Sequence, residues 1–264
     1  MGSVVSAVLG NADYFILLVF RVGGLVFSSP IFGRINIPAI AKIGFIAAIG
    51  YLFFTIFPQS AAIEYSTLME FALICALELL LGIALAFATN IFFALTAYTA
   101  GQLIDMQIGY GIVNVYDAQN STQAPVMGNV LNIILLIVFF AVEGHLRLID
   151  MVYMTIDRMP IGALSLSPEI GIVAAEIFMK AFLLGVMVAL PVIASGLTLE
   201  IILGMLMRSV PQIHMFVVGV PLKMLIGLIV FSVSLPVFIG FSNRIFDELF
   251  YGVEKMFGMF LGAS

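Results

Sequence analysis

The sequence predicts an all-α, membrane-type fold of about six long, broken hydrophobic helices arranged as hairpins. Of the 264 residues, 63% are hydrophobic and 9% are charged, and the mean hydropathy is +1.23. These values exceed what the core of a soluble domain of this length requires. The apolar residues also gather in runs near or above the roughly 20 residues that span a bilayer core. The runs are Tyr14–Phe32, Ile40–Phe57, Leu68–Ala100, Val130–Ile156, Ile172–Leu203 and Met215–Phe241.

A tight reversal is expected between the first two runs. Pro30, Gly33 and Pro38 end the first run and lead into the second, because proline and glycine interrupt helices. The first run also holds a cation, Arg21. A charged group facing lipid costs at least about 2.5 kcal/mol, so we expect Arg21 to face protein or water.

Further ionisable groups lie inside the later runs, and most of them must also avoid lipid. Glu176 and Lys180 stand four residues apart, the spacing at which a helix brings opposite charges together, so a local neutralising pair is expected. Glu143 and His145 stand two apart and do not share a helix face, which argues against a proton relay. The remaining members of this group are Glu70, Glu78, Glu200 and Lys223.

The last two runs contain residues that interrupt simple helices. Pro191 and Gly196 are expected to break the fifth run, and Gly219 with Pro221 the sixth. Broken helices occur where the backbone faces protein or a water-filled passage. A transporter with a binding site at the membrane midplane has this pattern, and so does a subunit bent around a shared pore.

The connection from Gly101 to Asn129 has an unusual composition. Its first half is apolar and aromatic without charge, and glycines weaken its helical continuity. Its second half, Asp117 to Gln123, is polar enough to be hydrated. Two readings remain open at this point: a re-entrant or packed loop, and a constriction that closes a channel by filling or dewetting it.

Basic residues do not fix the orientation of the chain. From Ile43 to Leu146 there is no Lys or Arg, although short loops of membrane proteins normally use these residues to select their side. A weakly biased permease would have this pattern. So would a chain whose position is set by partner subunits rather than by lipid.

Several classes of protein are disfavoured. There is no Gly-rich phosphate loop, no His and Cys spacing suited to a metal, and no convincing nucleophile with a base. An enzyme, a metal site and a cofactor are therefore not expected. A net charge of −5 without a basic cluster argues against nucleic acid as a partner. The single cysteine, Cys75, is read as a packing residue, and no cleavable signal peptide is apparent.

Motifs along nearly the whole chain resemble the FliR/SctT family of type III secretion export-gate proteins, and its flagellar branch most. Near the N-terminus they are Phe20-Arg21, Gly24, Pro30, Phe32-Gly33, Ile37-Pro38 and Lys42. In the middle they are Gly101-Gln102, Gln107, Gly109, Asp117, Pro125-Val126 and Glu143-Gly144-His145. Near the C-terminus they are Leu197-Thr198-Leu199, Leu203-Gly204, Arg208, Pro211-Gln212, Phe216-Val217, Gly219 and Pro221-Leu222.

The resemblance implies a single helical export-gate subunit over residues 1–264, similar to a fused P-type and Q-type gate protein. Residues of approximately 1–170 would form the P-like part, which includes the apolar 101–129 loop, and approximately 171–264 the Q-like helical hairpin. The implied partners are P-type and Q-type subunits, the B-type switch protein, the A-type export protein and unfolded export substrates. The implied location is the bacterial inner membrane within the flagellar basal body.

The resemblance also implies a channel-closing role for residues 106–117. Glycines would act as hinges, bulky residues as the obstruction, and Gln107 with Asn114 as polar contacts that order the closed loop. The expected plug residues are Gln107, Gly109, Tyr110, Gly111, Ile112, Val113, Asn114, Val115 and Tyr116. The expected structural residues are Arg21, Pro30, Gly33, Pro38, Arg208, Pro211, Gln212, Gly219 and Pro221.

The alternative function is a small polytopic secondary transporter. Pro191 and Gly219 would then mark broken helices, and Glu143, Glu176 or Lys180 would couple ions to substrate. A third reading is a membrane anchor for another complex, which leaves the apolar loop without a role.

Overall fold

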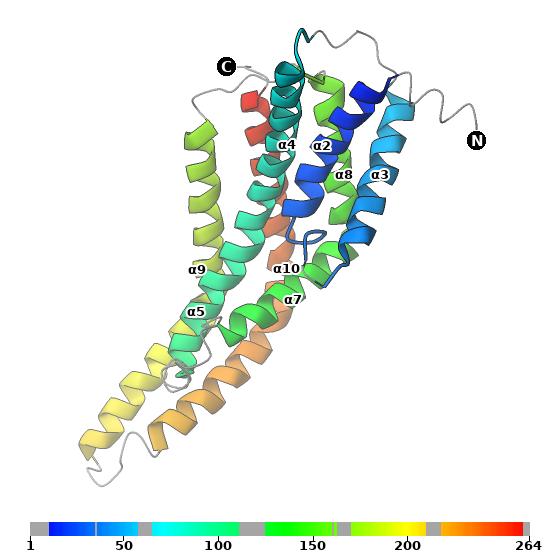
Figure 1. Cartoon of the computed structure of the whole chain (residues 1–264). Coiled ribbons are helices and arrows are strands. Elements are labelled where there is room, and N and C mark those ends of the chain that lie inside the picture. Colours follow the sequence, from blue (N-terminus) through cyan, green and yellow to red (C-terminus); the bar gives the residue numbers. More distant parts are fainter. Residues whose placement is uncertain are drawn as a thin grey trace. The chain divides into compact units, whose positions relative to one another are not determined.

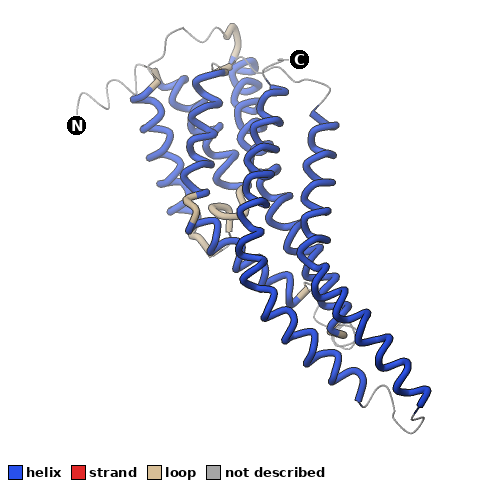
Figure 2. Tube along the Cα trace, turned by 180° about the vertical axis from the view of Figure 1, so that it is seen from behind, coloured by secondary structure: helices blue, strands red, loops and turns tan. Residues whose placement is uncertain are grey.

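The computed structural model describes residues 11–34, 36–57, 65–110, 125–159, 161–162, 170–209 and 218–260. All regular structure in these ranges is helical (Figure 2), which confirms the predicted all-α class. The helices are α2 (Ala12–Ser28), α3 (Ala39–Ile56), α4 (Leu68–Asn90), η1 (Ile91–Leu95), α5 (Thr96–Ile108), α7 (Val126–Ala141), α8 (Gly144–Arg158), α9 (Ile170–Ser209) and α10 (Val220–Phe260).

Helical segments occur in all six predicted runs, but two of the runs are not simple helices. The third continues from α4 through η1, a π-helical turn, into α5. The fourth bends by 68° between α7 and α8. Glu143 lies at this bend with a φ of 58°, a left-handed conformation that side-chain-bearing residues seldom adopt.

The breaks predicted in the last two runs are wrong. α9 is one helix of 40 residues that passes through both Pro191 and Gly196. A proline removes one intrahelical hydrogen bond, and a long apolar helix packed against neighbours can tolerate that loss. Gly219 and Pro221 lie where α10 begins instead of interrupting it. The first helical turn has no use for the missing N–H of proline, so Pro221 suits that position.

Four of the described helical stretches are long and apolar enough to cross a membrane. They are Ala39–Ile56, Leu68–Ile108, Ile170–Ser209 and Val220–Gly258. The bent pair α7 and α8 adds a fifth if it is taken as one span. The predicted membrane-type chain is therefore supported, with fewer candidate spans in the described residues than the six predicted.

The chain divides into two compact units, and each is discontinuous in sequence. Unit 1 comprises Met1–Ile91, Glu143–Ile177 and Leu249–Ser264, and unit 2 comprises Phe92–Val142 and Phe178–Glu248. The long helices α9 and α10 contribute residues to both units. The expected division into a P-like part up to about residue 170 and a Q-like hairpin beyond it stays a prediction.

Within unit 1, two glycines let α2 and α4 pack with their backbones in contact. A Cβ atom on Gly24 would lie 2.4 Å from the Leu79 carbonyl oxygen, and one on Gly82 would lie 2.1 Å from the Arg21 carbonyl oxygen. Any larger residue would force the helices apart. This contact fixes the register in which the side chains of α2 meet those of α4.

Within unit 2, aromatic residues form the core between elements far apart in the sequence. The ring centroids of Phe93 and Phe139 are 5.2 Å apart, and those of Phe139 and Phe246 are 5.3 Å apart. Thr96 at the start of α5 donates a hydrogen bond from its buried hydroxyl to the Ala181 carbonyl in α9, at 3.2 Å. α5 is thereby held against α9 along its first turn.

Candidate functional site: the base of the 107–116 loop

The last turn of α5 is where the predicted plug segment begins. α5 ends at Ile108, and Gly109 caps it with a φ of 94° while its N–H donates to the Asp105 carbonyl at 3.0 Å. Glycine ends helices in this left-handed conformation without steric cost. The expected hinge residue Gly109 therefore lies at the end of α5, and its role as a hinge stays a prediction.

α5 and α7 are clamped together at the two ends of this connection. A Cβ atom on Gly101 would lie 2.2 Å from the Cα of Gly128, so the two backbones touch. The buried Asp105 carboxylate accepts a hydrogen bond from the Met127 N–H at 3.3 Å. That N–H lies in the first turn of α7, where backbone donors lack intrahelical partners and favour a carboxylate.

Gln107 joins the same turn to α9. Its side-chain amide donates to the Ile193 carbonyl at 3.4 Å, and Gly196 leaves room for it: a Cβ atom there would lie 3.0 Å from the Gln107 Cγ. Figure 1 shows the end of α5 beside α9 and near the start of α7. Gln107 thus has a polar contact on α9, and its expected role in ordering the closed loop stays a prediction.

Of the other predicted plug residues, the structure describes Tyr110 but not residues 111–116. Tyr110 is half-buried and follows directly after the Gly109 cap. Gly111, Ile112, Val113, Asn114, Val115 and Tyr116 lie outside the described residues. Their expected role as hinge, obstruction and polar contact stays a prediction.

Arg21 and Glu78 form a fully buried ion pair in unit 1. The Arg21 Nε lies 2.5 Å from the Glu78 Oε2. The arginine also donates to the carbonyls of Thr155 and Met159, at the end of α8. The second carboxylate oxygen of Glu78 accepts from the Gly162 N–H at 2.8 Å. One pair therefore joins α2, α4 and the residues that follow α8, which confirms that Arg21 faces protein.

The predicted reversal after α2 is present. Gly33 donates its N–H to the Ser29 carbonyl at 2.8 Å, and a Cβ atom there would lie 2.5 Å from both the Ser29 and Phe27 carbonyl oxygens. Pro30 lies inside this turn, and Pro38 directly precedes α3. Lys42 ties the turn to α3 by donating to the Gly33 carbonyl at 2.9 Å.

The charged residues of α9 and α10 pair across sequence separations that a local pattern does not reveal. Lys180 and Glu248 are 3.0 Å apart, Glu176 and Lys255 are 2.5 Å apart, and Lys223 pairs with Glu200. The expected local pair of Glu176 with Lys180 stays a prediction. Arg208 is exposed in the last turn of α9, where a cation suits the free carbonyls of the helix end. Pro211 and Gln212 lie outside the described residues.

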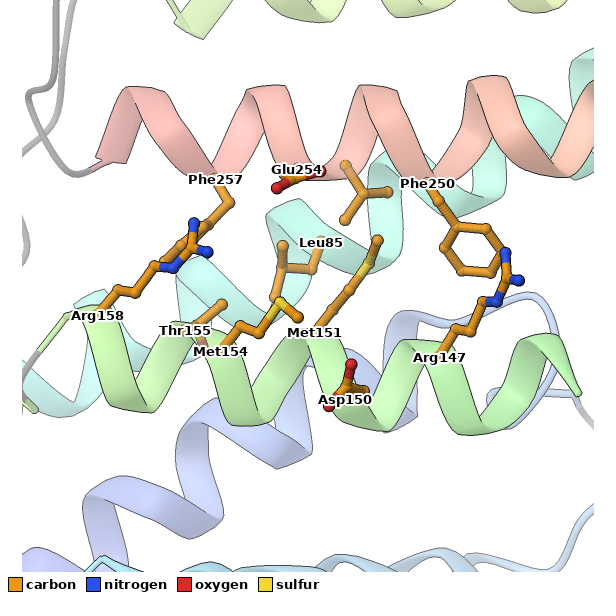
Figure 3. A pocket seen from close by; sticks show the side chains of 11 residues that line it. Leu85, Arg147, Asp150, Met151, Met154, Thr155, Arg158, Phe250, Glu254 and Phe257 are labelled. Atoms are coloured by element: carbon orange, nitrogen blue, oxygen red, sulfur yellow. The ribbon is translucent and has the colours of Figure 1, made fainter.

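A separate pocket of about 230 Å³ lies in unit 1 between α8, α10 and α4 (Figure 3). Two methionines and two phenylalanines line it together with Arg147, Arg158, Asp150 and Glu254. The Arg147 guanidinium lies 5.3 Å from the centre of the Phe250 ring. Figure 3 shows Arg147 and Arg158 near opposite ends of the pocket, so its cations do not converge. Its lining residues hold no nucleophile with a neighbouring base, and the described chain holds no cluster of three metal-ligating side chains.

Sequence reasoning did not identify Asp105, Gly128 or Gly196 as parts of the site. Asp105 carried one signal, because it is an acidic residue inside an otherwise apolar helical stretch. Glycines in helices carry no comparable signal for a distant partner. Their roles depend on which helix lies opposite.

The fold, the candidate spans and the clamped loop base describe a membrane-type helical protein without the elements of a catalytic centre in the described residues. Residues 12–249 match the bacterial export proteins, family 1. The chain belongs to this family, and it is an export protein and not an enzyme.

The similar proteins include several named flagellar biosynthetic protein FliR. The one from Escherichia coli strain K12 is 32% identical over 88% of each chain. The one from Bacillus subtilis strain 168 is 28% identical over 88% of this chain and 90% of the relative, and the one from Aquifex aeolicus strain VF5 is 26% identical over 93% of each. These similarities confirm the resemblance drawn from the sequence motifs.

Proposed function

We propose that this chain is a component of the flagellar type III export gate in the bacterial inner membrane, within the basal body. It forms part of the channel for unfolded export substrates, and its 107–116 segment helps to close that channel at rest. Its partners are P-type and Q-type gate subunits, together with the B-type switch protein and the A-type export protein. The proposal rests on membership of the export family and on similarity to a flagellar relative over 88% of each chain.

The observation that carries the closing role is the clamped base of the loop. The α5 end is fixed through Gln107 and Ile193, and the α7 end through Asp105 and Met127. The direct contact of Gly101 with Gly128 holds both ends together. A segment that returns to one closed position after each substrate needs a defined set of contacts at its base, because such contacts set the register of the closed loop.

The assembly is tested by co-expressing the chain with candidate P-type and Q-type subunits and measuring the masses of the purified complex by native mass spectrometry in mild detergent. A defined hetero-oligomer that contains one copy of this chain supports the proposal. A stable monomer or homodimer that ignores both partners overturns it.

The closing role is tested by replacing Ile112, Val113 and Val115 together with serine and measuring ion leakage through the assembled complex. Leakage at least tenfold above the parent is expected, because serine neither fills nor dewets a constriction. Ser121→Ala with Thr122→Ala is the control, since it changes the same connection outside residues 107–116. Loss of transport without leakage would favour a transporter, and no change would favour an anchor.

The secondary transporter has lost part of its basis. It required a broken helix at Pro191, and α9 is continuous there. The acidic and basic groups proposed to couple ions also have charged partners: Glu176 pairs with Lys255 and Lys180 with Glu248.

A further inference from the structure

The last turn of α5 packs against two glycines, Gly196 in α9 and Gly227 in α10. We call these two contacts the seat. Gly196 in α9 receives Gln107, as described above. Gly227 in α10 receives Ile108: a Cβ atom on Gly227 would lie 2.7 Å from the Ile108 Cγ1 and 3.5 Å from its Cβ. Ile108 is fully buried in this position. Gln107 and Ile108, which are neighbours in one turn, thus contact two different helices. Each contact is possible because the facing residue is glycine and has no side chain.

The seat is held by shape more than by strong bonds. Its one hydrogen bond, from Gln107 to the Ile193 carbonyl, has a length of 3.4 Å, near the limit for such a bond. Lys223 of α10 and Glu200 of α9 form an ion pair between the same two helices. In the sequence of each helix, the glycine of the seat lies between the paired residue and the proline. The contacts of Gln107 and Ile108 with the two glycines can separate and re-form without breaking a buried ion pair.

Both helices contain a proline: Pro191 precedes Gly196 in α9, and Pro236 follows Gly227 in α10. Pro191 leaves the Met187 carbonyl of α9 without its intrahelical N–H partner, and Pro236 does the same to the Ser232 carbonyl of α10. Pro191 and both neighbours of Pro236 line a cavity of about 90 Å³ that also touches Ile104 of α5. Helices bend most readily at proline, and a cavity gives the bending residues room.

We propose that Gly196 and Gly227 are positioning residues for α5, and that bending of α9 and α10 at Pro191 and Pro236 releases its last turn from the seat during export. With α5 seated, the channel is closed; with α5 released, a substrate can pass. This inference rests on the proposed function, because it assigns a regulator to the same closing segment.

A reversible disulfide tests the movement. Ile108→Cys with Gly227→Cys is made in a Cys75→Ala background, because the 3.5 Å between the two Cβ positions suits a disulfide. Oxidation should join the two cysteines, reduce export of a reporter substrate at least tenfold without raising ion leakage, and reductant should restore export. Ile108→Cys alone in the Cys75→Ala background is the control for oxidation itself.

The outcomes separate the inference from the proposed function. Failure of the two cysteines to join overturns the seat. A complete disulfide with unchanged export overturns the release of α5, while the serine substitutions at residues 112, 113 and 115 still decide whether the segment closes a channel.

A second variant keeps the test independent of cysteine chemistry. Gly227→Ala should displace Ile108 and raise leakage severalfold, and Ile108→Ala with Gly227→Ala should bring leakage back toward the parent. Gly240→Ala is the matched control on α10, because a Cβ atom there meets nothing within 4 Å. Equal leakage in the Gly227→Ala and Gly240→Ala variants overturns the inference.

Discussion

Arg21 and Glu78 stand 57 positions apart in the sequence and meet as an ion pair from which water is excluded. Burying two charges costs several kcal/mol for each ion unless their attraction and further hydrogen bonds offset it. Here the arginine has two carbonyl acceptors and the carboxylate has one N–H donor besides the pair itself. The pair therefore acts as a junction between three parts of unit 1.

Replacing Glu78 with glutamine should lower the free energy of unfolding by about 3–5 kcal/mol, because it leaves the Arg21 charge buried without a counter-ion. Unfolding of the purified chain by denaturant in mild detergent measures this loss. Arg21→Met combined with Glu78→Leu should cost less than Glu78→Gln alone, since no charge then remains buried. Asp157→Asn, at an exposed position of α8, is the control. A loss below about 0.5 kcal/mol for Glu78→Gln contradicts the assigned role.

Gly82→Ala should destabilise unit 1 by about 1–3 kcal/mol, because the new methyl group meets a backbone carbonyl that cannot move aside by changing a rotamer. The thermal midpoint of the purified chain reports the change. Gly44→Ala on α3 is the matched control, since a Cβ atom there meets nothing within 4 Å, and alanine favours a helix by up to about 1 kcal/mol over glycine. Equal behaviour of the two variants would show that α2 and α4 do not touch through their backbones.

Asp105→Ala should lower the free energy of unfolding by about 1–2 kcal/mol, because it leaves the Met127 N–H at the start of α7 without its acceptor. Hydrogen exchange at the Met127 amide should accelerate by a corresponding factor of at least about five. Asp105→Asn keeps an acceptor oxygen and should lower the free energy of unfolding by less than Asp105→Ala. Unchanged exchange at Met127 in the alanine variant would remove Asp105 from the base of the loop.

Tyr65 offers a test by pH outside the candidate spans. Its hydroxyl donates to the Asp13 carboxylate at 2.6 Å, and this hydrogen bond is the main cause that raises the pKa of the phenol. A raised folded-state pKa means that the contact stabilises the fold below the ordinary value of about 10 and is lost as pH rises through the folded value. Asp13→Asn should lower the pKa of Tyr65 in a phenolate absorbance titration, with Tyr65→Phe identifying its signal. An unchanged titration curve in the asparagine variant rejects the contact.

The helical class and the approximate positions of the long helices follow from the sequence, because apolar runs of this length have few other structures. The boundaries were less accurate where local residue preferences met tertiary packing. Pro191 reads as a break in isolation, yet α9 continues through it. Val142 and Glu143 do not read as a break, yet the chain bends there by 68°.

The sequence did not predict the long-range contacts at the base of the 107–116 segment, and the closing role of that segment stays a prediction. Gly109 and Gln107 were selected as parts of the plug, and both have defined local geometry. The partners Ile193 and Gly227 come from helices far away in the sequence, and Met127 comes from the next described helix. No periodic pattern links them to α5. Long-range pairs of this kind depend on which helix faces join, and a single sequence does not specify that.

The discontinuous make-up of the two units has a consequence for biosynthesis. Unit 2 needs α10 residues up to Glu248, and unit 1 needs those from Leu249 onward. The Phe246 ring and the Lys255 ammonium, which contact Phe139 and Glu176, leave the ribosome only after helices α2 to α9 have been synthesised. Neither unit can therefore complete its packing while the chain is still short, and the earlier apolar helices must be kept from aggregating until α10 has been synthesised.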